Sequence, residues 1–283
     1  MRASVLAANS RSPQVGAATG SGGSAVAATA RPPPSLPPQA PSNATDAPNA
    51  SARASYWTPG RFAEDRDVAM YLPAHFEETR LEVLHGFVRS HPFGMLVTQA
   101  VQGMVANGIP FLLDPEGSGG FGTLRAHVAR ANPVWREARR DEALVLFQGP
   151  QGYVSPAWYP AKAEHGKVVP TWNYATVQAR GPLRVIEDRT WLLALVTRLT
   201  DRHEAARAAP WAVADAPAAY VESMLGAIVG IEIELTSLVG KWKMSQNRAA
   251  ADRDGVVRGL AEAGDDATAA LARQVANPGQ ADG

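Results

Sequence analysis

Residues 168–187 read VVPTWNYATVQARGPLRVIE, and this stretch decides the fold that we expect. Its two runs, 168–179 and 183–187, are rich in β-branched and aromatic residues and predict one long strand or two. Gly181-Pro182 lies between the runs. Because proline cannot donate to a strand ladder, we expect a bulge or a corner of the sheet at this dipeptide.

Further strands are predicted on both sides. Short apolar runs before the quoted stretch predict strands at residues 93–98, 101–113, 121–125, 143–148 and 152–155. The second is expected to break at Asn107-Gly108 and at Pro110. After the stretch, residues 231–235 alternate between apolar and polar side chains, which is the period of a strand. Many short strands with few helices between them favour a small barrel over a parallel α/β sheet.

Helices are expected to flank these strands, which makes the fold class mainly β with flanking helices (α+β). The expected helices cover residues 75–90, 133–139, 190–204, 217–229 and the Ala-rich end from about 246. Asn132-Pro133 is a helix-start signal, since asparagine caps and proline suits the first helical position. We expect Ser245 to cap the last helix.

Residues 1–65 differ in composition from the rest of the chain. They are rich in Ala, Ser, Pro and Gly, and no aromatic residue precedes Tyr56. Such a segment buries too little apolar surface to offset its ordering entropy, so we expect a disordered low-complexity extension. One domain is expected over 70–265 and a helical or flexible tail over 266–283. Because folded sequence begins near Met70, translation is expected to start either at Met1 or at Met70.

Charge and cysteine content exclude several classes. The 27 basic and 27 acidic residues give a net charge of zero, which argues against wide contact with a phosphate backbone. There is no cysteine, so disulfides, cysteine nucleophiles and thiolate metal sites are excluded. The six histidines lack metal-ligand spacing, and no metal site is expected. No stretch is apolar for long enough to span a bilayer, and we expect a cytoplasmic protein.

One cluster of candidate binding residues lies between a strand end and a helix start. It contains Arg125, His127 and Arg130. Guanidinium groups match phosphate oxygens, and a helix N-terminus adds unpaired N–H groups, so the cluster can hold a phosphomonoester. The alternative is a solvated loop with ordinary surface ion pairs.

Three further clusters combine polar groups with aromatic rings. Their members are Ser155, Trp158, Tyr159 and Lys162; Thr171, Trp172 and Asn173; and Lys243, Ser245, Gln246, Asn247 and Arg248. The first two suit a planar heteroaromatic ligand, unless Trp158 and Trp172 are core anchors. The third, the densest polar set in the chain, is either an anion site at a helix start or a solvated basic helix entry.

These clusters and their surroundings resemble the PaiB-type family of FMN-binding negative transcriptional regulators. The resemblance runs from Met70 to about Leu260. Its motifs are YLPAHF (71–76), FGMLVT (93–98), HVARANP (127–133), FQGP (147–150), YVSP (153–156), WYP (158–160), VPTWNY (169–174), TDRHE (200–204) and GKWKMSQNR (240–248). The resemblance implies an FMN-binding split β-barrel of the pyridoxamine-phosphate-oxidase-like type, usually a homodimer with ligand sites at the subunit interface.

The resemblance also implies a role in repressing genes for degradative enzymes and sporulation. It implies FMN as cofactor, with Arg125, His127 and Arg130 as phosphate ligands and the aromatic, Asn and Ser positions near the flavin ring and ribityl chain. The expected partner is DNA or a regulatory protein. Two alternatives stay open: an FMN-dependent oxidoreductase, for which no catalytic residue is identifiable, and a haem-binding split barrel with His127 or His165 as axial ligand.

Overall fold

The computed structural model describes residues 70–117 and 119–278. The predicted extension at 1–65 therefore lies outside the described residues. The strands are β1 (Glu77–Glu78), β2 (Phe93–Ala100), β3 (Gly103–Pro110), β4 (Leu112–Asp114), β5 (Thr123–Ala129), β6 (Ala143–Val154), β7 (Thr171–Gly181), β8 (Leu183–Ile186), β9 (Ile228–Glu234) and β10 (Ser237–Lys243). The helices are α1 (Leu81–Ser90), α2 (Val134–Glu137), α3 (Ala161–His165), α4 (Arg189–Glu204), α5 (Ala218–Gly226), α6 (Ala250–Ala263) and α7 (Asp266–Ala276). Single 3-10 turns are η2 (Ala74–Phe76), η3 (Pro156–Trp158) and η4 (Val213–Asp215).

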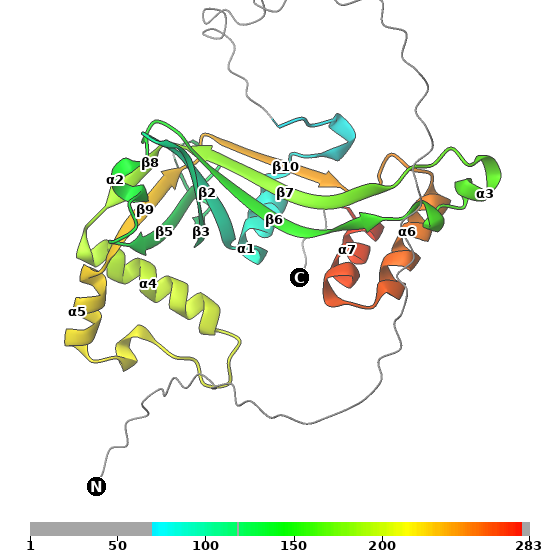
Figure 1. The fold of residues 1–283 in the computed structure, drawn as a ribbon. Helices are drawn as coiled ribbons and strands as arrows, with labels where there is room; N and C mark the ends of the chain where they lie inside the picture. The colour runs from blue at the N-terminus through cyan, green and yellow to red at the C-terminus, as the bar shows by residue number, and fades with distance from the viewer. Residues whose placement is uncertain (1–69, 118, 279–283) are drawn as a thin grey trace, which may run out of the picture. The chain divides into compact units, whose positions relative to one another are not determined.

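Two antiparallel sheets make up the architecture (Figure 1). The six-stranded sheet has the order β1-β10-β7-β6-β2-β3, and the four-stranded sheet has the order β4-β5-β9-β8. The chain passes between the sheets four times, from β3 to β4, from β5 through α2 to β6, from β7 to β8 and from β9 to β10. The sheets thus enclose one core as a split barrel, which confirms the predicted fold class.

The predicted corner at Gly181-Pro182 is confirmed, because β7 ends and β8 begins there. A Cβ atom added to Gly181 would lie 2.0 Å from the carbonyl oxygen of Glu234. Only glycine therefore lets this corner touch the end of β9. A hydrogen bond connects this corner to the corner between β9 and β10, since the Thr236 N–H donates to the Arg180 carbonyl at 2.9 Å.

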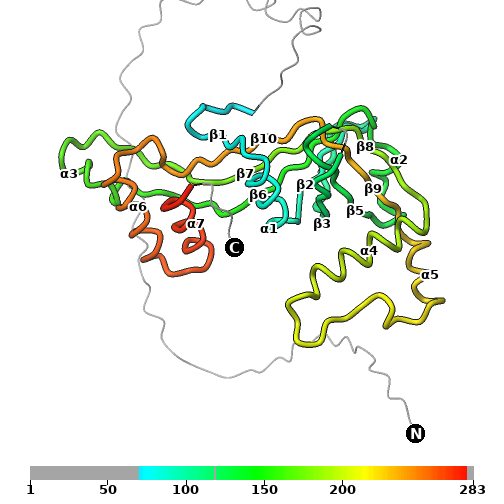
Figure 2. The backbone as a smooth tube through the Cα atoms, turned by 180° about the vertical axis from the view of Figure 1, so that it is seen from behind, coloured from blue at the N-terminus to red at the C-terminus, as the bar shows by residue number. Residues whose placement is uncertain are grey.

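The core lies between the sheets and extends under the helices. Phe111 and Phe147 are fully buried in edge-to-face contact, with ring centroids 5.9 Å apart. Helix α7 packs on β6 and buries Leu271 and Val275, although these residues fall in the tail predicted over 266–283. Helices α6 and α7 lie at one end of the long strands β6, β7 and β10, and α4 and α5 lie at the other (Figures 1 and 2).

The predicted helix over 75–90 was wrong in its first turn, since α1 begins at Leu81. Glu77 and Glu78 instead form β1 and pair with the edge of β10. The Glu78 carboxylate accepts from the backbone N–H of Arg80 at 2.9 Å and from its guanidinium at 2.6 Å. This local pairing ends the strand and sets the start of the helix.

Two further local predictions were wrong, and one was confirmed. β3 continues through Asn107-Gly108, because it pairs with β2 along its whole length. The C-terminal segment is helical as predicted, and Gly264, whose φ of 77° ends α6, divides it into two helices. Ser245 does not cap α6, since the N-cap is Ala249 without a side-chain bond. None of the helices in the described ranges combines the length and apolar character needed to cross a membrane.

Candidate functional site

Two motifs that are far apart in the sequence meet at one end of the six-stranded sheet. Thr171 and Asn173 begin β7, and Lys243 ends the neighbouring β10 opposite Tyr174. The turn that follows β10 then leads to α6. A pocket of about 110 Å³ lies there, which we call the β7–β10 pocket, and it is lined by Phe76, Thr171, Asn173, Lys243, Ser245, Asn247 and Arg248.

Asn173 and Ser245 form a buried pair in this pocket. Asn173 Nδ2 donates to Ser245 Oγ at 2.9 Å, and the serine hydroxyl donates to Asn173 Oδ1 at 3.3 Å. Ser245 has a φ of 62°, and among residues 70–117 and 119–278 no other non-glycine residue has a positive φ. Such a backbone conformation is costly for a residue with a Cβ atom and is concentrated at functional sites.

The turn around Ser245 is held by the side chain of Gln246. Gln246 Oε1 accepts from the Met244 N–H at 2.7 Å, and its amide nitrogen donates to the Trp242 carbonyl. Gln246 thus uses both ends of its amide on the backbone. It supports the pocket instead of lining it.

Lys243 and Arg248 give the pocket a positive charge. Lys243 Nζ donates to the Trp172 carbonyl at 2.6 Å and to the Thr171 hydroxyl. Burial, followed by the positive charges of Lys241 and Arg248, lowers the pKa of Lys243. None of the residues that line the pocket is acidic. An anion in the pocket would therefore relieve a repulsion that the lining residues leave uncompensated.

Tyr159 adds a buried hydroxyl next to Arg248. The Arg248 guanidinium carbon lies 5.1 Å from the centroid of the Tyr159 ring. The hydroxyl is buried, and the Arg248 guanidinium lies near enough to donate to it. Burial raises the pKa of Tyr159, so this hydroxyl stays protonated. Because a guanidinium can only donate, the Tyr159 O–H remains available to donate to a ligand atom.

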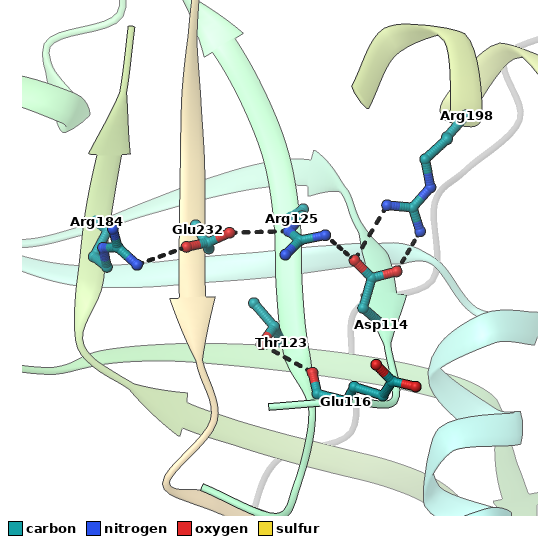
Figure 3. Close-up of polar contacts among 7 residues, drawn as sticks. All are labelled: Asp114, Glu116, Thr123, Arg125, Arg184, Arg198 and Glu232. Atoms are coloured by element: carbon teal, nitrogen blue, oxygen red, sulfur yellow. Dashed lines mark hydrogen bonds and ion pairs between the residues drawn. The ribbon is translucent and has the colours of Figure 1, made fainter. Parts of the chain in front are cut away.

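The first predicted phosphate residue, Arg125, lies on the four-stranded sheet in a network of ion pairs (Figure 3). Arg125 Nε donates to Glu232 Oε2 at 2.9 Å, and Nη1 donates to the Asp114 carboxylate. Asp114 also accepts from Arg198 of α4, and Glu232 accepts from Arg184 of β8 at 3.0 Å. The hydrogen bond from Arg198, followed by the charge of Arg125, holds the pKa of Asp114 below its usual value. Arg125 thus links strands and a helix and has its charge balanced.

Arg130 and His127 also lie away from the β7–β10 pocket. Arg130 Nη1 pairs with Glu187 at 2.6 Å, and its Nε donates to the Gly226 carbonyl at 2.9 Å. His127 lies on β5 opposite Gly230. His165, the other predicted axial ligand for haem, accepts the Lys167 N–H at Nδ1 at 3.0 Å within its own loop.

The remaining predicted residues do not line the pocket. Ser155 accepts the Ala157 N–H at 3.2 Å and caps η3. Trp158 packs on α6, where a Cβ atom added to Gly259 would lie 2.3 Å from its ring. Trp172 Nε1 donates to Gln151 Oε1 at 2.9 Å. Lys162 is exposed on α3, and Phe76, which the sequence did not single out as a ligand residue, lines the pocket from η2.

Within the described ranges, no three His, Asp or Glu side chains are grouped so that they could hold a metal ion.

A family described as "Putative FMN-binding domain" matches residues 70–237. The "Protease synthase and sporulation protein PAI 2" of Bacillus subtilis is 31% identical over 192 residues, which cover 68% of this chain and 89% of that protein. The chain belongs to the PaiB-type family of FMN-binding domains. The resemblance predicted from the sequence motifs is thereby confirmed, and FMN is the cofactor of the family.

An uncharacterized protein of Emericella nidulans is 38% identical over 246 residues, which cover 75% of this chain and 98% of that protein. Among solved structures, the "FAD and Heme binding protein from Mycobacterium smegmatis" is 17% identical with a TM-score of 0.46 and covers 65% of this chain and 80% of that one.

The β7–β10 pocket of this PaiB-type domain fits the phosphate group of FMN. It offers an ammonium, a guanidinium and uncharged donors, which is the donor set that phosphate oxygens prefer. Its volume of about 110 Å³ is well below the roughly 300–1,000 Å³ of pockets that enclose a whole small molecule. The pocket therefore suits the phosphate and leaves the flavin ring outside it.

Proposed function

We propose that this chain is a PaiB-type, FMN-binding negative regulator of transcription that acts as a homodimer and holds the FMN phosphate in the β7–β10 pocket. The main support for this proposal is that Lys243 and Arg248 share a pocket without an acidic lining residue. Arg125 and Arg130, by contrast, are already paired with carboxylates. When bound, FMN supplies a planar redox-active ring.

Each residue of the pocket has a distinct proposed role. Lys243 and Arg248 make charge-assisted hydrogen bonds to the phosphate oxygens. The Tyr159 hydroxyl, which lies beside Arg248, donates to the same group. Asn173 and Ser245 hold the turn in place, so that the donors are oriented before the ligand arrives.

The outer face of the six-stranded sheet supports the homodimer. Phe93, Met95 and Met104 project from β2 and β3 on this face, and Phe93 and Met104 are 66% and 73% exposed. Neighbouring exposed apolar side chains on one face of a sheet mark an interaction surface. The strand register places Lys243 on the same face as Met95. A second copy packed on this face would approach the β7–β10 pocket and supply the missing wall for the flavin ring.

We do not expect such a regulator to act through wide contact with the phosphate backbone of DNA. The net charge is zero, whereas proteins that contact many phosphates carry a large positive surface. We therefore propose that the flavin-loaded state or a partner protein transmits the signal. The Bacillus subtilis relative is named for protease synthase and sporulation, which supports a role in control of gene expression.

The test is a titration of the full chain with FMN, followed by quenching of flavin fluorescence. Saturable binding is expected, and Lys243→Ala should weaken it about 10- to 100-fold, the range for a charge-assisted hydrogen bond. Lys162→Ala, which changes an exposed lysine on α3, is the matched control and should leave the affinity unchanged. Absence of saturable FMN binding, or equal affinities for the chain and Lys243→Ala, would contradict the proposal.

A further inference from the structure

A second pocket lies between the four-stranded sheet and α4, away from the β7–β10 pocket. Its volume is about 330 Å³, and we call it the β5–α4 pocket. The lining residues are Pro110 of β3, His127 of β5, Leu199, Thr200, His203 and Glu204 of α4, and Trp211 of the loop after α4. The pocket joins two motifs that the flavin site does not use, residues 127–133 and 200–204. Its volume falls within the range of pockets that bind small molecules.

His127 lines this pocket and carries a buried polar atom. Its Nδ1 is buried and has no hydrogen-bond partner among the described residues. Burial lowers the pKa of His127, so the imidazole is neutral at neutral pH. A neutral imidazole nitrogen accepts or donates a hydrogen bond according to its tautomer. A ligand atom in the pocket would supply the partner that the protein does not.

The loop after α4 places Trp211 at the pocket, and Glu204 holds that loop. Glu204 Oε2 accepts the Trp211 N–H at 3.1 Å, and Oε1 pairs with Arg207 Nε at 2.9 Å. The loop is further tied by the Ala212 N–H, which donates to Asp215 Oδ2 at 2.8 Å. Both carboxylate oxygens of Glu204 are therefore engaged, and its charge is balanced by Arg207. The Trp211 ring remains 49% exposed.

These groups define the chemistry of a ligand. Pro110, Leu199 and Trp211 give the pocket apolar walls, and no lysine or arginine lines it. An indole ring favours a flat aromatic partner. The polar groups that line the pocket are the His127 imidazole, the Thr200 hydroxyl, the His203 ring and the Glu204 carboxylate, and the charge of Glu204 is balanced by Arg207.

We propose that the β5–α4 pocket is a second ligand site, separate from the flavin site, for a small neutral planar ring compound that makes one hydrogen bond to His127 Nδ1 and stacks on Trp211. The ligand is of the size of a phenol or a nitrogen heterocycle. It binds without contact to Lys243 or Arg248, so its occupancy does not require FMN.

The test follows the imidazole nitrogens of the full chain, labelled with ¹⁵N-histidine, by NMR. Phenol and pyridine are the probes, because one donates and the other accepts a hydrogen bond, and toluene is the probe without a polar atom. The His127 Nδ1 signal, assigned with His127→Gln, should shift saturably with phenol or pyridine and much less with toluene. The signals of His75 and His165 should stay unchanged.

Variants distinguish a specific binding site from non-specific binding of the probes. Trp211→Ala should weaken probe binding about 2- to 10-fold, the range of an aromatic pair. Trp172→Ala is the matched control, since both indoles are 49% exposed, and it should leave probe binding unchanged. Lys243→Ala should also leave it unchanged, whatever that variant does to FMN. The proposal is overturned if neither polar probe shifts His127 up to its solubility limit, or if Trp211→Ala and Trp172→Ala behave alike.

Discussion

Asn173 Nδ2 donates a hydrogen bond to Ser245 Oγ across 2.9 Å, and both residues are buried. The bond joins the start of β7 to the turn after β10, across 72 positions in the chain. It holds Ser245 in a left-handed backbone conformation that serine seldom adopts. The pocket for the phosphate thus depends on a strained turn that a distant strand keeps in place.

Two replacements of Ser245 should distinguish the effect of losing its hydrogen bond with Asn173 from the effect of its strained backbone conformation. Ser245→Ala leaves the buried Asn173 amide unpaired and should lower the free energy of unfolding by about 1–3 kcal/mol. Ser245→Gly loses the same bond but tolerates a positive φ, so it should be about 1 kcal/mol more stable than Ser245→Ala. Urea unfolding measures both. Equal stabilities for the two variants would show that the backbone of Ser245 carries no strain.

The ion-pair network on the four-stranded sheet predicts a pH effect. The pKa of Asp114 is held below its usual 3.8 by Arg198 and Arg125, so its stabilising contribution is present above about pH 4 and is lost as the pH falls through the lowered pKa. Asp114→Asn should therefore be destabilised by roughly 1–2 kcal/mol at neutral pH, and this difference should shrink in acid.

Thermal unfolding at several pH values measures the effect of Asp114→Asn. Asp141→Asn is the control, because its pair with Arg139 is exposed, and it should change little. A difference between the chain and Asp114→Asn that stays constant from neutral pH into acid would contradict the assignment.

Charge introduced on the outer face of the six-stranded sheet should break the proposed homodimer. The chain mass is 29.9 kDa, so sedimentation equilibrium should give about twice this mass for the chain and the single mass for Met104→Asp. Tyr220→Asp is the control, because Tyr220 is 58% exposed on α5, outside this face. A monomeric chain, or a Met104→Asp dimer, would refute this interface.

Much of the fold could be predicted from the sequence, because its signals are local. The dipeptide Gly181-Pro182 marked the corner between the sheets, and the alternation over 231–235 marked β9. Strand β10 was not predicted, since Gly240 interrupts an inner face whose other members are Leu238 and Trp242. Glycine is favoured at this position over any residue with a side chain, because Leu84 and Trp242 occupy the space that a Cβ atom would fill.

The candidate site could be predicted only in part. Residue types pointed to Thr171, Asn173, Lys243 and Arg248, but not to their meeting in one pocket, which depends on the register of β7 with β10. Residue types also could not tell which arginine is free to bind an anion. Arg125 lies directly opposite Glu232 only because β5 pairs with β9 in one particular register.

The central claim is that the FMN phosphate binds at Lys243 and Arg248. The most direct test compares FMN with riboflavin, which lacks the phosphate, on the chain, on Arg248→Ala and on Arg130→Ala, by fluorescence titration. We predict that the chain prefers FMN by about 10- to 100-fold, that Arg248→Ala loses most of this preference without changing riboflavin affinity, and that Arg130→Ala keeps it. Loss of the preference in Arg130→Ala, with Arg248→Ala unaffected, would contradict the account and assign the phosphate to the four-stranded sheet.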